Sequence, residues 1–330
     1  MATIEQRGKA WRARIRRKNY STQSATFDSK ADAEKWVRKI EGKMDINTFN
    51  DLSEAEHTTL KDGLERYLKE VTPSKKGAAQ ETIRIKKWQK HPISRRSLMS
   101  LRSMDFAEER DARIYKGLKA STIRNDFGVI SNLFNTAIKE WGMTGLVNPV
   151  KHIKKPSLPR GRERRLLPHE EKKLLAISNP ILRAVITILI ETGMRRGELC
   201  LLEWKNVDLH SRVARLIDSK NGESREVPLS TKAVKVFKTL ASSRDKNELY
   251  NNRIIQFSPH TITHMFISAC KKVNILDLRL HDLRHEATSR MVEGGKLNMI
   301  EIAAITGHKT MIMLRRYSHP KATEMAKKLG

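Results

Sequence analysis

Six polar side chains in the second half of the sequence have the types that phosphoryl transfer needs. Each one alone has an ordinary structural explanation, such as a capping histidine or a core tyrosine whose hydroxyl is satisfied. Together they supply cations, imidazoles and one phenolic hydroxyl, which are groups that bind or attack a phosphate. They are Arg195 after Gly193-Met194, at a helix entry whose backbone N–H groups favour an anion, Lys220 beside a tight turn, His281 and Arg284 on one helical face, His308 after Gly307, and Tyr317 before Pro320.

The whole chain is basic. Its 330 residues contain 65 Lys and Arg against 37 Asp and Glu, which leaves a net charge of +28. The excess is spread along the sequence, with +6 in residues 1–50, +9 in 51–160 and +13 in 161–330. Such a chain needs a long polyanion as its partner, and nucleic acid is the first candidate.

Membrane insertion and a disulfide framework are both disfavoured. The longest apolar run, Ala184 to Ile190, is far shorter than the ~20 residues of a spanning helix, and the start of the chain lacks the apolar stretch of a signal peptide. Only Cys200 and Cys270 are present, which fits a reducing compartment. We therefore expect an intracellular DNA-binding protein with no membrane partner.

The first fifty residues predict a small sheet backed by one helix. Trp11, Ala13 and Ile15 alternate with three arginines, so a strand would have one apolar and one basic face, and a second strand covers Ser24 to Phe27. A helix follows Ser29, which has Asp32 at capping distance. We interpret the basic face, formed by Arg12, Arg14 and Arg16, as a DNA contact. The alternative is a solvated edge strand whose charges block edge-to-edge pairing.

The segment from about His57 to Pro149 predicts only helices. Apolar residues recur at helical spacing after Leu60 and, most strongly, after Ser121, until Gly142 ends the pattern. A basic cluster in the middle suits phosphate contacts, although a solvated face is the usual explanation of such a cluster. Its candidate DNA-binding residues are Lys86, Lys87, Arg95 and Arg96.

Residues 151–165 predict an extended basic linker, because they combine Pro156, Pro159 and Gly161 with many cations. Lys154 and Lys155 are its candidate DNA contacts. A basic linker between two basic domains would let them close around a duplex.

The last part of the chain mixes helices with one hairpin. An apolar helix starts at Pro180 and ends at Gly193, and a second helix is expected from Arg195 to Trp204. Val213 to Ile217 and Arg225 to Leu229 predict two strands around Asn221-Gly222. Helices return from about Thr261.

These motifs resemble those of the tyrosine recombinases, the phage-integrase family of site-specific DNA recombinases. Five motifs occur in the family's order, and the match extends over nearly the whole chain. Residues 121–149 are similar to the family's core-site-binding domain, and residues 1–50 to its small arm-site-binding module. The motifs are Thr192-Gly193-Met194-Arg195-Arg196-Gly197-Glu198-Leu199, the lysine hairpin Ser219 to Leu229, His281-Asp282-Leu283-Arg284-His285, Thr306-Gly307-His308, and Tyr317.

The resemblance implies a mainly α fold with small β elements. Residues 1–50 would be an arm-type DNA-binding module of sheet plus helix, and 57–150 an all-helical core-site-binding (SAM-like) domain. The basic linker 151–165 would lead to a mixed α/β catalytic domain at 166–330.

It also implies a metal-free strand transfer through a covalent 3′-phosphotyrosine. Arg195 and Arg284 would bind the non-bridging oxygens, since guanidinium groups donate paired hydrogen bonds there. Tyr317 would be the nucleophile and needs a base or a positive field, because tyrosine ordinarily ionises near pH ~10. The remaining roles are His281 as the candidate base, Lys220 as the acid for the leaving 5′ oxygen, His308 as a brace for the phosphate, and Glu198 and His285 as supporting groups.

The implied setting is an integrase of a phage or integrative element in the bacterial cytoplasm and nucleoid. Its partners would be double-stranded attachment sites bound by a homotetramer, with an excisionase and a host DNA-bending protein as helpers that the residues do not identify. No cofactor, ATP or metal is expected, since the bond is exchanged and the cations replace metal ions.

Three other functions compete with this interpretation. A type IB topoisomerase shares the site chemistry, but the front half of the chain suits paired site recognition. A non-catalytic DNA-binding regulator would explain the positive charge of the chain, but it would leave the ordered set of candidate catalytic residues as a coincidence. A metal-dependent nuclease needs a carboxylate cluster that the sequence does not single out.

Overall fold

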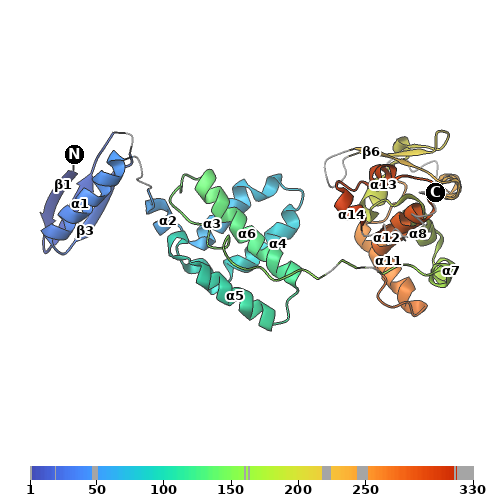
Figure 1. Ribbon diagram of the computed structural model, residues 1–330, viewed down its shortest axis with the longest axis horizontal. Coiled ribbons are helices and arrows are strands. Elements are labelled where there is room, and N and C mark those ends of the chain that lie inside the picture. The colour runs from blue at the N-terminus through green and yellow to red at the C-terminus, as the bar shows by residue number, and fades with distance from the viewer. Residues whose placement is uncertain are drawn as a thin grey trace, which may run out of the picture. The chain divides into compact units, whose positions relative to one another are not determined.

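The computed structural model describes residues 2–18, 20–46, 51–159, 161–162, 164–217, 224–243, 252–315 and 317. The chain divides into an N-terminal unit, Met1–Arg160, and a C-terminal unit, Gly161–Gly330 (Figure 1). This division falls inside the segment predicted as a linker. Within the described ranges, no helix is long and apolar enough to cross a membrane.

The N-terminal unit begins with a three-stranded antiparallel sheet covered by one helix. The sheet has the order β1-β2-β3, and α1 packs on it. Ser29 caps α1 by accepting a hydrogen bond from the Asp32 amide, as predicted. The first strand, β1, was not predicted. The elements are β1 (Ala2–Arg7), β2 (Ala10–Ile15), β3 (Gln23–Phe27) and α1 (Lys30–Asp45).

The two faces of β2 differ as its alternation predicts. Ala13 and Ile15 are fully buried in the small core that α1 closes. Arg12 and Arg14 are half-buried on the opposite face, where Arg12 lies directly across from Glu5 of β1. Arg16 is exposed just beyond the strand.

The rest of the N-terminal unit is helical, as predicted, and has its own hydrophobic core. The long helix α6 is central, since α3, α4 and α5 all contact it. Leu133 and Phe134 of α6 are fully buried there. The elements are α2 (Ser53–His57), α3 (Leu60–Glu70), α4 (Ala78–Gln89), α5 (Ser103–Tyr115) and α6 (Ala120–Lys139), with 3-10 turns at Thr72–Ser74, Pro92–Arg95 and Leu98–Ser100.

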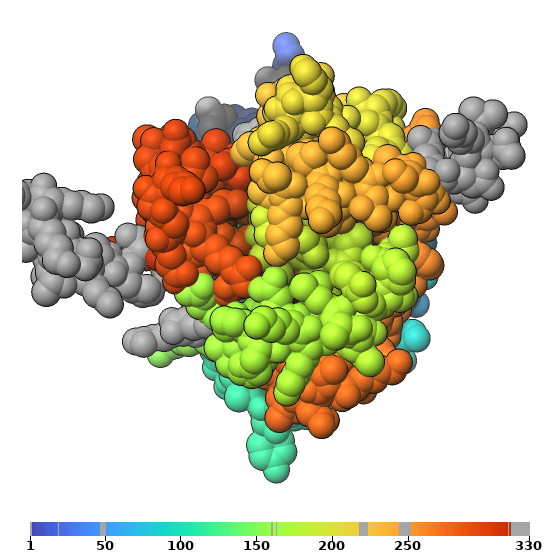
Figure 2. Space-filling model, turned by 90° about the vertical axis from the view of Figure 1, so that its right-hand side faces the viewer, coloured from blue at the N-terminus to red at the C-terminus, as the bar shows by residue number. Residues whose placement is uncertain are grey.

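The C-terminal unit is built around the apolar helix α8 (Pro180–Thr192). Asn179 caps its start, Pro180 occupies its first turn, and nearly every residue from Leu182 to Ile190 is buried. The helices α7 (Pro168–Ile177), α9 (Arg196–Leu201), α10 (Thr231–Ser242), α11 (Pro259–Lys272) and α12 (Asp282–Glu293) all contact α8. In Figure 2, the gold segment that includes α10 lies above the yellow-green α7–α8 segment. The helices packed around α8 therefore hold the side chains that project from them at fixed positions.

The other elements of the C-terminal unit include a small antiparallel sheet in the order β4-β5-β6. The predicted hairpin strands are β5 and β6, and the helix after Arg195 is shorter than predicted because a 3-10 turn, Trp204–Asn206, follows it. The helices α7 and α10 and the strand β4 were not predicted. The elements are α7 (Pro168–Ile177), α9 (Arg196–Leu201), β4 (Val207–Asp208), β5 (Val213–Leu216), β6 (Arg225–Pro228), α10 (Thr231–Ser242), α11 (Pro259–Lys272), α12 (Asp282–Glu293), α13 (Met299–Thr306) and α14 (Met311–Arg315).

Candidate functional site

Two glycines end the helices that lead into the site. Gly193 follows α8 with φ +64°, and a Cβ there would lie 3.2 Å from Thr306 Cγ2. Gly307 follows α13 with φ +70°, and its Cβ would lie 3.0 Å from the Arg225 guanidinium. Only glycine adopts this backbone without strain and also leaves this space. The chain turns sharply at both glycines. These turns bring Arg195, two residues after Gly193, and His308, directly after Gly307, into one cluster.

Glu198 holds Arg195 in place. The Arg195 backbone N–H donates to Glu198 Oε2 (2.7 Å), and its Nη1 donates to Oε1 (2.7 Å). Its Nη2 donates to the Gly307 carbonyl (3.0 Å), so the side chain is fixed from two elements. The Glu198 carboxylate thus lies at the helix entry whose backbone N–H groups were expected to favour an anion.

Arg225 of β6 belongs to the same cluster and was missed by the sequence analysis. It donates to both Glu198 oxygens (2.9 and 2.7 Å) and from Nε to the Ile305 carbonyl (3.0 Å). Burial alone would raise the pKa of Glu198, but hydrogen bonds from Arg225 and Arg195 lower it to about 2. The carboxylate is therefore ionised and offsets part of the positive charge. The only signal for Arg225 in the sequence is its place at the start of the second hairpin strand.

Arg284 reaches the site from α12 and is almost completely buried. Its Nη1 donates to the Gly193 carbonyl (2.6 Å). Burial, and then the charge of Arg195, lower the pKa of Arg284 to about 10, which still leaves the guanidinium charged at neutral pH. A buried cation beside another cation is strained electrostatically, and an anion bound there would relieve that strain.

His308 is neutral at physiological pH. Burial and the charges of Arg284 and Arg195 lower its pKa to about 4. Its Nδ1 lies 2.6 Å from Thr306 Oγ1, whose own proton is donated to the Ile302 carbonyl (2.5 Å). Nδ1 is therefore the donor in this pair, and Nε2 carries the lone pair. His308 could donate from Nε2 to a phosphate only after it takes up a proton, which a bound anion would favour.

The low pKa of His308 makes a testable contribution to stability. Between its ordinary pKa of 6.5 and about 4, the unfolded chain binds a proton at this residue and the folded chain does not. The free energy of unfolding should therefore fall as the pH is lowered through this window. We expect His308→Gln to gain stability relative to wild type as the pH falls from 7 to 4.5, measured by thermal melts. A difference that stays constant with pH would contradict the assignment.

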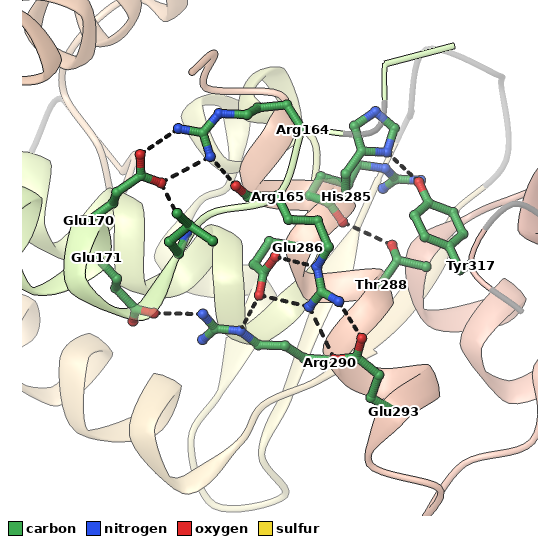
Figure 3. Close-up of polar contacts among 12 residues, drawn as sticks. Arg164, Arg165, Glu170, Glu171, His285, Glu286, Thr288, Arg290, Glu293 and Tyr317 are labelled. Atoms are coloured by element: carbon green, nitrogen blue, oxygen red, sulfur yellow. Dashed lines mark hydrogen bonds and ion pairs between the residues drawn. The ribbon is translucent and has the colours of Figure 1, made fainter. Parts of the chain in front are cut away.

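Tyr317 follows α14, and its hydroxyl contacts His285 Nδ1 of α12 (Figure 3). The two ring centroids are 5.9 Å apart, and the His308 ring lies 6.1 Å from the Tyr317 ring. His281, the candidate base of the sequence analysis, is exposed at the start of α12 and packs edge-on against His285 at 5.1 Å. The histidine that contacts the Tyr317 hydroxyl is therefore the one expected to play only a supporting role.

The structure thus brings Arg195, Arg284, His308 and Tyr317 into one cluster. Lys220 and the turn that carries it lie outside the described residues. A hollow of about 430 Å³ opens beside this cluster, lined in part by Arg195, Arg225 and His308. Within the described ranges there is no group of three or more His, Cys, Asp or Glu side chains that could hold a metal ion.

The four candidate DNA-binding residues of the helical part of the N-terminal unit are exposed, but two of them have partners within the unit. Lys86 and Lys87 project from α4, and Arg95 from the 3-10 turn that follows. Lys87 lies 3.6 Å from the Asp126 carboxylate. Arg96 is committed within the unit, because it donates to Asp105 (2.5 Å) and to the Ser100 carbonyl (2.5 Å). It is therefore a weaker candidate for a phosphate contact than Arg95.

The linker lysines are also exposed, but the backbone beside them is held. Arg110 donates to the Lys154 carbonyl (2.9 Å), and Arg124 donates to the Pro156 carbonyl (3.2 Å). Lys155 is exposed between these two attachment points. This part of the predicted linker is extended, as expected, but packs against the helical core.

Several known proteins are similar to this chain in sequence. Residues 164–324 match the model of the phage integrase family. The chain is 37% identical over 281 residues to a shufflon-specific DNA recombinase of Escherichia coli, covering 82% of this chain and 71% of that protein. It is 32% identical over 341 residues to a putative integrase/recombinase of Haemophilus influenzae, covering 98% of this chain and 89% of that protein.

Solved integrase structures share the fold. The Tn1549 transposon integrase in complex with circular intermediate DNA superposes with a TM-score of 0.68 at 20% identity, over 83% of this chain and 99% of that one. A lambda integrase dimer bound to a COC′ core site gives a TM-score of 0.64 at 21% identity, over 95% of this chain and 93% of that one. The predicted mainly α fold with small sheets is confirmed.

The chain belongs to the phage integrase family of tyrosine recombinases. It is an enzyme, a site-specific DNA recombinase.

Proposed function

We propose that this recombinase cuts and rejoins DNA through a covalent 3′-phosphotyrosine at Tyr317. The observation that carries the proposal is the contact between the Tyr317 hydroxyl and His285, beside Arg284, Arg195 and His308. A phenolic oxygen next to an imidazole and several cations can lose its proton and attack phosphorus. Attack would expel the 5′ oxygen of the broken strand, and Lys220 would supply its proton.

Arg195 and Arg284 would stabilise the negative charge that gathers on the non-bridging oxygens. Both are held by protein carbonyls, Gly307 for Arg195 and Gly193 for Arg284, so little reorganisation is needed when phosphate binds. Glu198 and Arg225 would keep Arg195 oriented through their shared hydrogen bonds. His308 would brace the phosphate as a donor once it is protonated.

His285 and His281 have separable roles in this scheme. We propose that His285 takes the Tyr317 proton, and that His281 orients the His285 ring from its edge-on position. His285→Ala should lower the rate of adduct formation by about 10²–10⁴-fold, as loss of a general base does. His281→Ala should cost less at neutral pH, measured on the same DNA in single-turnover reactions. A larger loss with His281→Ala would restore His281 as the base.

The domains and partners follow from the same proposal. Residues 1–50 would bind arm-type sites, 57–150 core sites and 166–330 the scissile phosphate, joined by the linker 151–165. Arg12, Arg14, Arg16, Lys86, Lys87, Arg95, Lys154 and Lys155 would contact phosphates, with Arg96 in a minor role. A lambda integrase tetramer bound to a Holliday junction shares the fold of this chain, which supports a homotetramer on two double-stranded sites. The proposed setting is the bacterial cytoplasm. An excisionase and a host DNA-bending protein would assist.

Covalent capture from a library of short random duplexes, each nicked once, tests the proposal. The nick lets a short fragment diffuse away after cleavage and traps the adduct. We expect the wild-type protein to retain DNA through denaturing washes in EDTA without ATP, because neither a metal nor ATP takes part. Loss of capture in EDTA, or binding without any adduct, would contradict the mechanism.

The captured sequences also identify the sites. The relatives with 37% and 32% identity are named for a shufflon and for integration. Mapping the captured sites on the source DNA shows whether the paired sites lie in one element or in an element and its target.

A further inference from the structure

Helix α12 has two faces with different partners. His281 precedes its first residue, and Arg284 and His285 lie on the face that meets Gly193 and Tyr317. Asp282, Glu286 and Glu293 fall within about 40° of one another on the helical wheel and form a carboxylate face, which lies roughly opposite Arg284 and about 60–100° from His285. Ion pairs made by the carboxylate face therefore act on the same helix that carries Arg284 and His285.

The carboxylate face is bound by arginines from the start of the C-terminal unit. Arg162 Nη2 donates to Asp282 (3.1 Å), and Arg165 Nε donates to Glu286 (2.9 Å). Arg165 also donates from Nη2 to Glu286 (3.1 Å) and to Glu293 (3.0 Å) (Figure 3). One guanidinium thus spans two turns of the helix.

Glu286 is the centre of this network. Its side chain is only 3% exposed, and it also accepts from Arg290 (2.8 Å), which in turn binds Glu171 of α7 (2.6 Å). Burial alone would raise the pKa of Glu286, but the hydrogen bonds from Arg165 and Arg290 hold it below its ordinary value. A buried carboxylate that is charged needs both cations, so the network responds as a whole when one is removed.

We propose that Arg165 and Glu286 are positioning residues for strand cleavage, which clamp the start of the C-terminal unit to α12 on the side opposite Arg284. The clamp holds Arg284 and His285 at the spacing that Gly193 and Tyr317 require. This inference rests on the proposed role of the α12 side chains. Misplacement by about 1 Å at a reacting centre can cost about 10²-fold in rate, so a loose α12 should be visible in the chemical step.

The test separates DNA binding from chemistry in the full-length protein. Arg165→Ala, Arg165→Lys and Glu293→Gln are compared with Arg215→Ala, which removes an ion pair between exposed side chains in the same unit. The probe is the nicked duplex that the wild-type protein captures most strongly. For each variant, the dissociation constant, the single-turnover rate of adduct formation at saturating DNA, and the melting temperature are measured.

We expect Arg165→Ala to slow adduct formation by about 10- to 100-fold while affinity changes by less than about twofold. Arg165→Lys should recover part of the rate because it keeps the charge without the fork, and Arg215→Ala should match wild type. Glu293→Gln weakens only the exposed ion pair between Glu293 and Arg165. Its rate of adduct formation should fall between those of wild type and Arg165→Ala, and it tests the clamp if Arg165→Ala folds poorly.

Two outcomes would overturn the proposal. One is an unchanged rate in Arg165→Ala and Glu293→Gln. The other is a loss of rate that disappears when variants are assayed at equal distance below their melting temperatures, since the arginine would then only stabilise the fold. If wild type itself forms no adduct, the proposed function fails instead. In that case faster hydrogen exchange of residues 284–293 in DNA-free Arg165→Ala than in Arg215→Ala still tests the clamp.

Discussion

Replacing Tyr317 with phenylalanine should abolish covalent capture of DNA and leave DNA binding intact. The substitution removes one oxygen and keeps the ring, so the packing beside His285 and His308 is retained. We expect a loss of at least about 10⁴-fold in adduct formation, the size seen when a nucleophile is deleted. Denaturing gels of labelled nicked duplex measure the adduct.

The matched control is Tyr115→Phe. Tyr115 is 95% exposed at the end of α5, so the change removes a hydroxyl with no structural role. It should cleave like wild type. Adduct that persists in Tyr317→Phe would mean that another tyrosine is the nucleophile, whereas binding without adduct in both wild type and variant would remove the catalytic scheme.

The second large effect is expected at Arg284. Its guanidinium is buried and already anchored to the Gly193 carbonyl, so its remaining donors are preorganised for phosphate. Loss of one such donor group typically costs about 10²–10³-fold in the chemical step. We expect Arg284→Ala to reach or exceed this range in single-turnover cleavage.

Arg284→Lys should rescue little of that loss. A lysine has one charged centre and no planar fork, so it cannot hold the carbonyl and two phosphate oxygens together. The burial and positive neighbours that lower the pKa of Arg284 would also lower that of a lysine, which neutralises far more readily. Affinity should change little, because one phosphate contact among many alters mainly the salt dependence.

The control for this pair is Arg215→Lys, at an exposed ion pair on the hairpin. It should leave the rate constant unchanged. If Arg284→Lys were nearly as fast as wild type, the role of Arg284 would be simple charge neutralisation, and paired hydrogen bonding would not be required.

The sequence by itself determined the order and type of the groups that we propose to do the chemistry. It predicted Arg195, Arg284, His308 and Tyr317 as site residues, and the structure brings them together. Arg195 and His308 each lie just after a glycine that ends a helix. Gly193 and Gly307 end their helices with positive φ, and Ser29 and Asn179 cap theirs. Such signals depend on residues a few positions apart, so they can be recognised along the chain.

Tertiary structure decided which of these groups touch. His281 and His285 are one helical turn apart, and only the path of the chain after α14 selects His285 as the neighbour of the Tyr317 hydroxyl. Arg225 meets Glu198 across 27 residues, and Arg165 meets Glu286 across 121. Ion pairs of this kind leave no periodic pattern, because an arginine in a basic chain looks the same whether it faces DNA or a buried carboxylate. Long-range packing alone separates the arginines that hold the fold from those left free for phosphate.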